Sequence, residues 1–267
     1  MIRPFIIDVH GHIGPAKGFR ARHFSTDDIV RLMDATWVEV MIFVSMSLLS
    51  QQYGLGYSET LRALDRHPRR LRAYTVFDPA WPDVSMRLLR QYQDHPGIVG
   101  IKIHPSVHGA PPEDTRYAEM WDYADSRKLP VLTHTWAPDP ANPSQNYATP
   151  DRFDQILEAH PGARLILGHC GGRMEGHRLA AEMLKKHPNC WADISGDTHS
   201  LGLLEWLARE AGVGKILYGT DVNWIEPRYH LGKVLKAGLP PEDKLRILRT
   251  NALDVFGDKL ISTESGV

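Results

Sequence analysis

The chain has 267 residues, of which 42% are hydrophobic and 24% charged, with a formal net charge of −1. A chain of this length can form one large domain or two small ones. Its nearly balanced charge gives no sign of a basic surface that would bind nucleic acid or an anionic membrane. The longest apolar runs are too short to span a bilayer. Two cysteines are too few for a disulfide-stabilised fold, and the N-terminal residues do not show the basic-then-apolar pattern of a signal peptide. We therefore expect a soluble, cytoplasmic protein with a small-molecule substrate and neither nucleic acid nor membrane as partner.

Eight short apolar segments rich in β-forming residues recur along the chain, and segments with helical periodicity separate them. The strands are expected at 5–10, 39–45, 71–77, 98–104, 129–134, 164–169, 190–195 and 215–220. Such alternation is typical of a parallel sheet that helices cover on its faces. Eight units predict an α/β protein with one (β/α)8 TIM-type barrel domain, regular or distorted, over residues 1–267. A doubly wound open sheet is the alternative.

Eight of the 14 histidines fall into two groups of four. In four His-Pro pairs the histidine follows a helical stretch and the proline stops the helix, so these pairs indicate helix ends. These pairs begin at His67, His95, His160 and His187. The second group closes predicted strands, at His10, His104, His134 and His169, and Asp221 follows the eighth strand. Because the active site of a (β/α)8 barrel is built at these strand ends, the second group predicts a catalytic cluster.

The segment "FIIDVHGHIG" (5–14) carries Asp8, His10 and His12 on the first strand. Alternate residues of a strand face the same side, so we expect all three side chains to point into the barrel. His10 and His12 would meet one ion, and Asp8 would hold an imidazole in its metal-binding tautomer. Imidazoles with a carboxylate suit one divalent ion, most simply Zn²⁺, with Mn²⁺ as the other candidate. Hydrogen-bonded core histidines without a metal are the alternative.

Six motifs then follow in order over nearly the whole chain: "DVHGH", "GIKIHP", "THT", "LGHCGG", "YGTD" and "NALDVFG". Together they resemble the amidohydrolase superfamily, and specifically the amidohydrolase-related branch. That branch includes aminocarboxymuconate-semialdehyde decarboxylase, related aromatic-acid decarboxylases, and lactone and ester hydrolases. The resemblance implies one metal ion bound by His10, His12, His134 and Asp221. It also implies that Asp221 accepts a proton from the metal water, and that His169 either acts nearby as a general acid or base or polarises the substrate carbonyl.

Several residues keep two interpretations. Lys102 and His104 share a face of the fourth strand and are candidates for a substrate contact. Lys102 is interpreted as a barrel-interior group or as a contact for a substrate carboxylate, since lysine acts as a point charge. In binuclear amidohydrolases a strand-four lysine bridges two metals, but Lys102 lies one layer too deep in the barrel for that role. Asp193 either orients a neighbouring group or is a satisfied interior carboxylate. Cys170 is interpreted as packing. Asn251 resembles a motif that closes the last helix onto the barrel, with a helix cap as the alternative.

The loops after the strands are expected to carry specificity. Four side chains just past the catalytic strands are candidates to line a pocket: His108, Trp136, Arg173 and Trp224. Arg173 is the best candidate to bind a substrate carboxylate, because a planar guanidinium can form hydrogen bonds with both carboxylate oxygens. Ordinary surface packing is the alternative for each of the four.

These features favour a metal-dependent hydrolase that uses metal-bound hydroxide on an amide, ester or lactone, with Asp221 and His169 moving protons. The alternative is non-oxidative decarboxylation of an aromatic or muconate-type acid in the same pocket. Because the sequence offers no arginine-rich rim to anchor such an acid, hydrolysis is the preferred prediction. A third hypothesis is a catalytically silent metal-binding barrel, and the sequence leaves homo-oligomer formation open.

Overall fold

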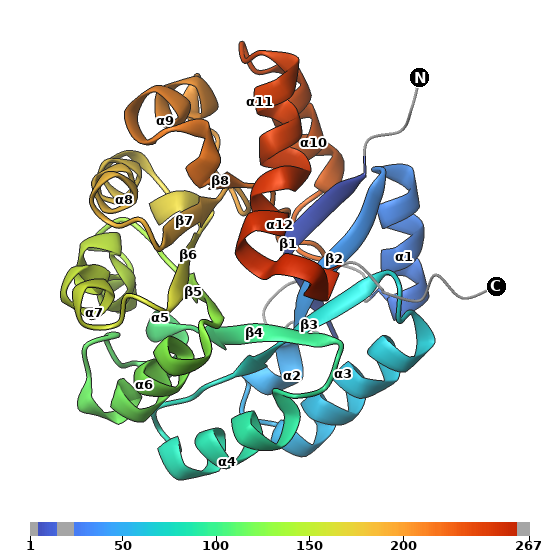
Figure 1. Ribbon diagram of the computed structural model, residues 1–267, viewed down its shortest axis with the longest axis vertical. Helices are drawn as coiled ribbons and strands as arrows, with labels where there is room; N and C mark the ends of the chain where they lie inside the picture. The colour runs from blue at the N-terminus through green and yellow to red at the C-terminus, as the bar shows by residue number, and fades with distance from the viewer. Residues whose placement is uncertain (1–4, 15–23, 261–267) are drawn as a thin grey trace.

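The computed structural model describes residues 5–14 and 24–260. Its eight strands form one parallel sheet in chain order, with helices on the outside (Figure 1). The strands are β1 (Ile6–Ile13), β2 (Val38–Ser45), β3 (Leu71–Val76), β4 (Ile98–Ile103), β5 (Pro130–His134), β6 (Arg164–Gly168), β7 (Cys190–Asp193) and β8 (Ile216–Leu217). Hydrogen bonds from Val9 N to Tyr218 O (3.0 Å) and from Asp221 N to His10 O (2.7 Å) join the last strand region to the first. The predicted (β/α)8 barrel is confirmed, and the open-sheet alternative is wrong.

Helices follow the strands along the chain, as the alternation in the sequence predicts. The α-helices are α1 (Thr26–Ala35), α2 (Met46–Leu49), α3 (Tyr53–Arg66), α4 (Pro82–Tyr92), α5 (Pro105–His108), α6 (Ala118–Arg127), α7 (Asp154–Ala159), α8 (Met174–Lys186), α9 (Leu203–Ala211), α10 (Pro227–Lys236), α11 (Pro241–Leu245) and α12 (Asn251–Phe256). Ser25 caps α1 through a capping box with Asp28. The His-Pro histidines His67, His160 and His187 form the C-caps of α3, α7 and α8. Within the described residues, no helix is long and apolar enough to cross a membrane.

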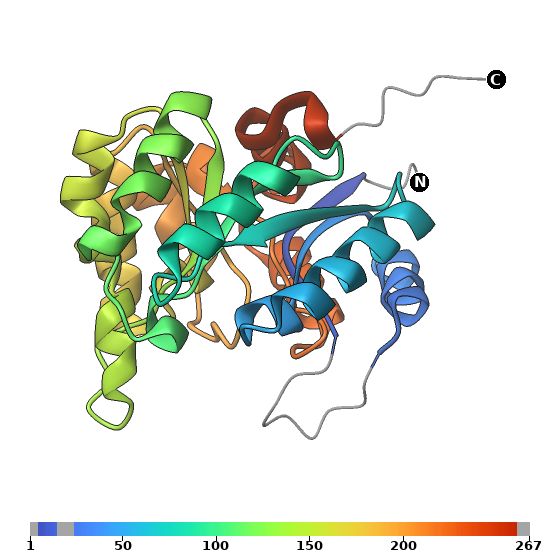
Figure 2. The same ribbon diagram turned by 90° about the horizontal axis from the view of Figure 1, so that it is seen from below.

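The core has two layers, one inside the barrel and one between the barrel and its helices. Inside, inward-facing side chains of the strands pack against Val255 and Phe256 of α12. Figure 2 shows α12, in red, at the end of the barrel where the strands begin. Asn251 is fully buried and its side-chain N–H groups donate to the carbonyls of Val213 (2.8 Å) and Ile216 (2.7 Å). Asn251 therefore fastens the last helix to the barrel, and the helix-cap alternative is wrong.

Candidate active site

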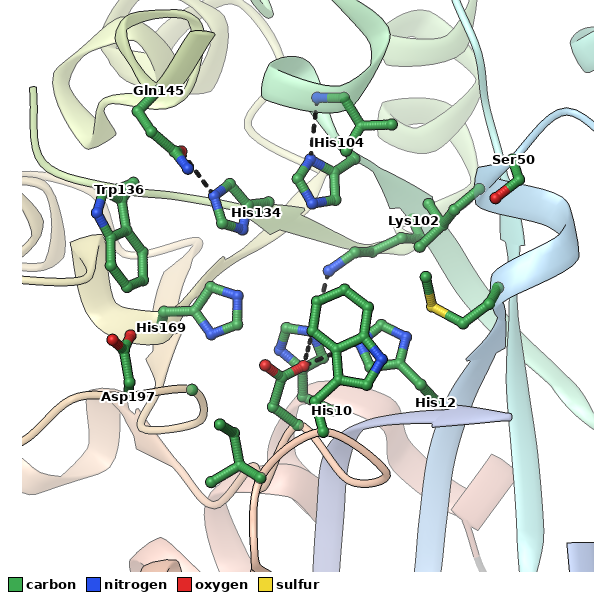
Figure 3. Close-up of a pocket in the computed structure, with 17 residues that line it drawn as sticks. His10, His12, Ser50, Lys102, His104, His134, Trp136, Gln145, His169 and Asp197 are labelled. Atoms are coloured by element: carbon green, nitrogen blue, oxygen red, sulfur yellow. Dashed lines mark hydrogen bonds and ion pairs between the residues drawn. The ribbon is translucent and has the colours of Figure 1, made fainter. Parts of the chain in front are cut away.

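A cavity of about 550 Å³ opens at the carboxyl ends of the strands, opposite α12. Its wall combines ionisable side chains from the strand ends with apolar side chains from the following loops (Figure 3). The lining residues are His10, His12, Met46, Leu49, Ser50, Lys102, His104, Val107, His134, Trp136, Gln145, His169, Gly196, Asp197, Asp221, Trp224 and Ile225. All four strand-closing histidines of the sequence analysis thus reach one cavity.

The register of β1 decides which of its side chains enter the cavity. Asp8 pairs with Met41 of β2, and Gly11 pairs with Phe43. Between these two pairs β1 advances by three residues and β2 by two, so β1 contains one extra residue. Such a shift interrupts the alternation of faces and re-aims the side chains beyond it. His10 and His12 line the cavity, whereas Asp8 lies with Met41 and with Met33 of α1 on the outer face.

The expectation that Asp8 orients an imidazole is therefore wrong. Its carboxylate accepts hydrogen bonds from Thr220 Oγ1 (2.5 Å), Thr220 N (3.2 Å) and His10 N (3.0 Å). Burial raises the pKa of Asp8 to about 7, against these hydrogen bonds. Asp8 ties the backbone of β1 to the segment after β8.

The metal-ligand candidates His10, His12 and Asp221 converge inside the cavity. Their ligand atoms all lie within 4.8 Å of one another. Asp221 Oδ1 lies 2.9 Å from His12 Nε2 and 3.8 Å from His10 Nε2. Burial lowers the pKa of both imidazoles, that of His10 to about 4. Burial pushes the pKa of Asp221 upward, but the hydrogen bond with His12 and the charge of His169 hold it well below its ordinary value.

Asp193, at the end of β7, holds the ring of His10. Its Oδ2 lies 2.9 Å from His10 Nδ1, and both side chains are buried. Burial pushes the pKa of Asp193 upward, but the interactions with His10 outweigh it and keep the pKa below its ordinary value. An ionised carboxylate only accepts, so His10 Nδ1 carries the proton and Nε2 keeps its lone pair for the cavity. Of the two interpretations of Asp193, the structure therefore supports the orienting one.

His169 stands beside this cluster in an unusual backbone conformation. Its φ is +61°, and Cys170 after it has φ of +46°. Positive φ is rare outside glycine and occurs at functional sites where the surroundings enforce it. The His169 ring centroid lies 4.9 Å from those of His10 and His134. Cys170 is fully buried and burial raises its pKa to about 12, consistent with packing.

Lys102 and His104 point into the cavity from β4 (Figure 3). The Lys102 Nζ lies 3.1 Å from His10 Nε2, and burial lowers the pKa of this lysine to about 8. The amine is therefore still mostly a cation at neutral pH. His104 stacks on His134, with ring centroids 4.2 Å apart and planes at 10°.

His134 lies next to the His10–His12–Asp221 triad and not within it. Its Nε2 lies 2.9 Å from Gln145 Oε1. Its ring continues the stack with Trp136, with centroids 5.9 Å apart and planes at 7°. His134 as a metal ligand stays a prediction, and this stack forms one flat wall of the cavity.

The loop candidates divide into two pairs. Trp136 and Trp224 line the cavity, and Trp224 stacks on His12 with centroids 5.4 Å apart. Arg173 and His108 do not belong to the lining. The Arg173 guanidinium pairs with Asp197 (2.8 Å) and lies over the Trp136 ring (5.6 Å), outside the cavity.

The sequence analysis missed the roles of Ser195, Gln145 and Asp197. Ser195 follows Asp193 by two residues at the end of β7, so the alternation of strand faces could have found it. Gln145 lies in the short 3₁₀ helix Pro143–Ala148 and Asp197 in a loop, and neither segment gives a periodic signal in the sequence.

The donor set fits a divalent metal ion. Two neutral imidazoles and an ionised carboxylate are the protonation states that metal binding requires. A carboxylate behind His10 completes the carboxylate–histidine arrangement of protein metal centres. The fold and the site thus define a (β/α)8 barrel with a centre built for a divalent metal ion.

The family model described as Amidohydrolase matches residues 7–257. The chain therefore belongs to the amidohydrolase family, as its motifs predict. Gamma-resorcylate decarboxylase of Rhodococcus jostii (strain RHA1) is 22% identical over an alignment of 305 positions, gaps included, that covers 89% of each protein.

Solved structures share the fold. The 2,6-dihydroxybenzoate decarboxylase from Rhizobium superposes with a TM-score of 0.74 and 16% identity, over 95% of this chain and 98% of that one. The 5-carboxyvanillate decarboxylase of Novosphingobium aromaticivorans, complexed with manganese and 4-hydroxy-3-methoxy-5-nitrobenzoic acid, gives a TM-score of 0.75 and 14% identity, over 95% and 96%.

These comparisons overturn the preference for hydrolysis. The similar proteins carry the names of decarboxylases, which matches the alternative of the sequence analysis. The absence of an arginine-rich rim does not count against an acid substrate, because a basic side chain inside the cavity can take the place of a rim arginine. The cavity holds a cation in its interior, at Lys102.

Proposed function

We propose that this protein is a metal-dependent decarboxylase that removes CO₂ from an aromatic or muconate-type acid. The observation that carries the proposal is the position of the Lys102 amine, 3.1 Å from a ligand candidate of the metal triad in a cavity with flat, apolar walls. A site that binds a planar acid needs both features: a cation that pairs with the carboxylate and aromatic side chains that stack on the flat part of the substrate.

Lys102 is the proposed carboxylate anchor. It is 1% exposed, so its charge acts in a region that water screens little. The amine lies beside His10 Nε2, which places the bound carboxylate next to the triad. Arg173 is not assigned this task, because Asp197 already pairs with its guanidinium.

The walls suit a flat substrate. The stacked rings of His104, His134 and Trp136 form one side, and Trp224 stacked on His12 lies on another. Met46 and Leu49 add apolar surface. Aromatic bodies gain offset-stacked or edge contacts with such rings.

The metal would be one divalent ion, Zn²⁺ or Mn²⁺, held by His10, His12 and Asp221 with His134 as a further ligand. When bound, it supplies positive charge that orients the substrate oxygens and stabilises the charge that develops on them. The imidazole and carboxylate donors accept either ion.

His169 is the proposed proton donor. Its Nδ1 is engaged by Ser195 Oγ (2.9 Å), which leaves Nε2 for the cavity. As the bond between the ring carbon and the carboxylate breaks, its electron pair stays on the ring carbon and CO₂ leaves. His169, whose Nδ1–H is held by Ser195, takes up a proton from solvent at Nε2 and delivers it to that carbon to form the new C–H bond, which returns the ring to its neutral Nδ1–H form.

The test is CO₂ release by metal-free protein reloaded with Zn²⁺ or Mn²⁺ separately. The substrates are 2,6-dihydroxybenzoate and 5-carboxyvanillate, with a phenyl ester and a lactone as hydrolysis controls. We expect CO₂ in a one-to-one ratio to the acid consumed, and none from metal-free protein. Hydrolysis of the ester or lactone without any CO₂ release from the acids would refute the proposal.

Lys102→Met tests the anchor. Removing a hydrogen bond to a charged group costs about 1.5–3 kcal/mol, which corresponds to a KM about 10–100-fold higher. Lys185→Met is the control, because Lys185 lies on α8 and pairs with Glu210 at the surface. Unchanged KM in Lys102→Met would remove Lys102 from substrate binding.

A further inference from the structure

Ser195 is buried between the two histidines that face the cavity from β1 and β6. Its Oγ lies 2.9 Å from His169 Nδ1 and 3.0 Å from His10 Nδ1. The same oxygen lies 2.5 Å from Asp193 Oδ1. One hydroxyl thus joins a carboxylate to both imidazoles.

Hydrogen-bond accounting fixes the direction of each bond. The Asp193 carboxylate can only accept, so the Ser195 hydroxyl proton points to Asp193 Oδ1. The Ser195 oxygen is then left with lone pairs alone; it accepts from the Nδ1–H of His169 and shares the Nδ1–H of His10 with Asp193 Oδ2. Both rings are therefore held in the Nδ1–H tautomer, with Nε2 toward the cavity.

The two histidines depend on Ser195 to different degrees. His10 Nδ1 also contacts Asp193 Oδ2 (2.9 Å), so it keeps a partner without the serine. For His169 Nδ1, Ser195 is the partner that the described structure provides. Removing the hydroxyl should therefore affect His169 and spare His10.

The backbone around His169 is built for this contact. Asp193 Oδ1 accepts from His169 N (3.1 Å) and from Ser195 N (2.9 Å), so one carboxylate fixes both residues. Gly196 has φ of +75°, and a Cβ there would lie 2.6 Å from His169 Nδ1. Glycine is required both by this conformation and by the close approach of the ring.

We propose that Ser195 is a positioning residue that sets the tautomer and orientation of His169, through the chain Asp193–Ser195–His169. The role of His169 in proton transfer rests on the proposed function, but the positioning itself does not. The tests below separate the two.

The first readout is the tautomer of His169 by ¹⁵N NMR of zinc-loaded, ¹⁵N-histidine-labelled protein, with the signal assigned by its loss in His169→Asn. We expect the Nδ1–H form in the wild type. In Ser195→Ala we expect the signal to shift to the Nε2–H form or to an exchange average, while zinc content stays at the wild-type level. An unchanged Nδ1–H signal in Ser195→Ala would overturn the proposal.

Two further variants keep the test decisive. Ser85→Ala is the matched control, because Ser85 is a buried serine on α4 whose Oγ bonds the backbone of Asp78. It should leave the His169 signal in place. Gly196→Ala displaces the ring while keeping the Ser195 hydroxyl, and should shift the same signal even if Ser195→Ala fails to fold.

The second readout is kcat with the acid that the protein decarboxylates. Loss of a positioning contact of this kind lowers activity by about 10–100-fold. A shifted tautomer with a lowered kcat supports both the positioning and the role of His169. A shifted tautomer with wild-type kcat supports the positioning and contradicts the proposed proton transfer by His169.

Discussion

His12 Nε2 lies 2.9 Å from Asp221 Oδ1, although the two residues are separated by 209 positions. The contact exists because the barrel closes at this point, where His12 N donates to the carbonyl of Val222 (2.5 Å). Closure of the fold and assembly of the metal triad are therefore one structural event. A chain that fails to pair β1 with the segment after β8 has no such centre.

Asp221→Asn should abolish stoichiometric metal binding. The substitution keeps the size of the side chain but removes the anionic ligand between His10 and His12. Metal per chain, measured after dialysis against metal-free buffer, should fall from about one to near zero. Asp197→Asn changes a carboxylate of the same cavity outside the triad and should retain the metal. Full metal content in Asp221→Asn would contradict the ligand assignment.

Asp193→Asn and Asp8→Asn should differ in their effect on the metal. Asp193 holds the His10 ring, and loss of such a partner weakens metal affinity by about 10–100-fold. Asp8 touches Thr220 and the backbone of β1, so Asp8→Asn should keep wild-type affinity. Titration with a competing chelator measures both. Equal losses of affinity in the two variants would show that the register shift in β1 does not separate their roles.

His230 should make the protein less stable in acid. It is fully buried, and neither ring nitrogen has a hydrogen-bond partner in the described part of the structure. Burial, and then the charge of Lys233, lower its pKa to about 3; Asp221 and Asp193 oppose this shift, and His169 adds to it. The unfolded chain therefore binds a proton below about pH 6.5 that the folded chain does not, so stability is present above this pH and lost as pH falls toward 3.

His230→Phe should flatten this part of the pH dependence. Urea unfolding at steps from pH 7 to pH 4 would give the free energy of unfolding for the variant and the wild type. The wild type should lose more stability than the variant over this range. Parallel curves would mean that His230 is not the group responsible.

Asn251→Ala should lower the free energy of unfolding by about 1–3 kcal/mol, because it removes the side-chain donor from the buried carbonyl of Ile216 and a second hydrogen bond to the carbonyl of Val213, which keeps the N–H of Ile216 as a donor. Val213 lies just before β8, and Ile216 is the first residue of that strand. Asn142→Ala, at an exposed position in the loop after β5, is the control and should change stability little. Metal content per folded molecule should be normal in both variants, since α12 lies at the end of the barrel opposite the cavity.

The alternation of apolar strand segments with helical segments was sufficient to predict the barrel. The histidines that end four of these segments were sufficient to predict the cluster at the strand ends. The alternation of faces along a strand failed at Asp8, because the pairing shift between Asp8 and Gly11 cannot be read from one strand in isolation. The roles of Ser195 and Gln145 could not be predicted, because they depend on contacts with residues that are distant in the sequence, His169 and His10 for Ser195 and His134 for Gln145. The choice between hydrolysis and decarboxylation depends on what surrounds Lys102, and its contact with His10 on another strand exists only once the barrel is closed.

The most direct test of the account is CO₂ release from aromatic acids by the protein loaded with one Zn²⁺ or Mn²⁺ per chain, beside Asp221→Asn treated in the same way. The account predicts CO₂ equal to the acid consumed in the wild type and none in the variant. Release of CO₂ at the wild-type rate by Asp221→Asn, or its absence from metal-loaded wild-type protein across a panel of hydroxybenzoates and muconate-type acids, would contradict it.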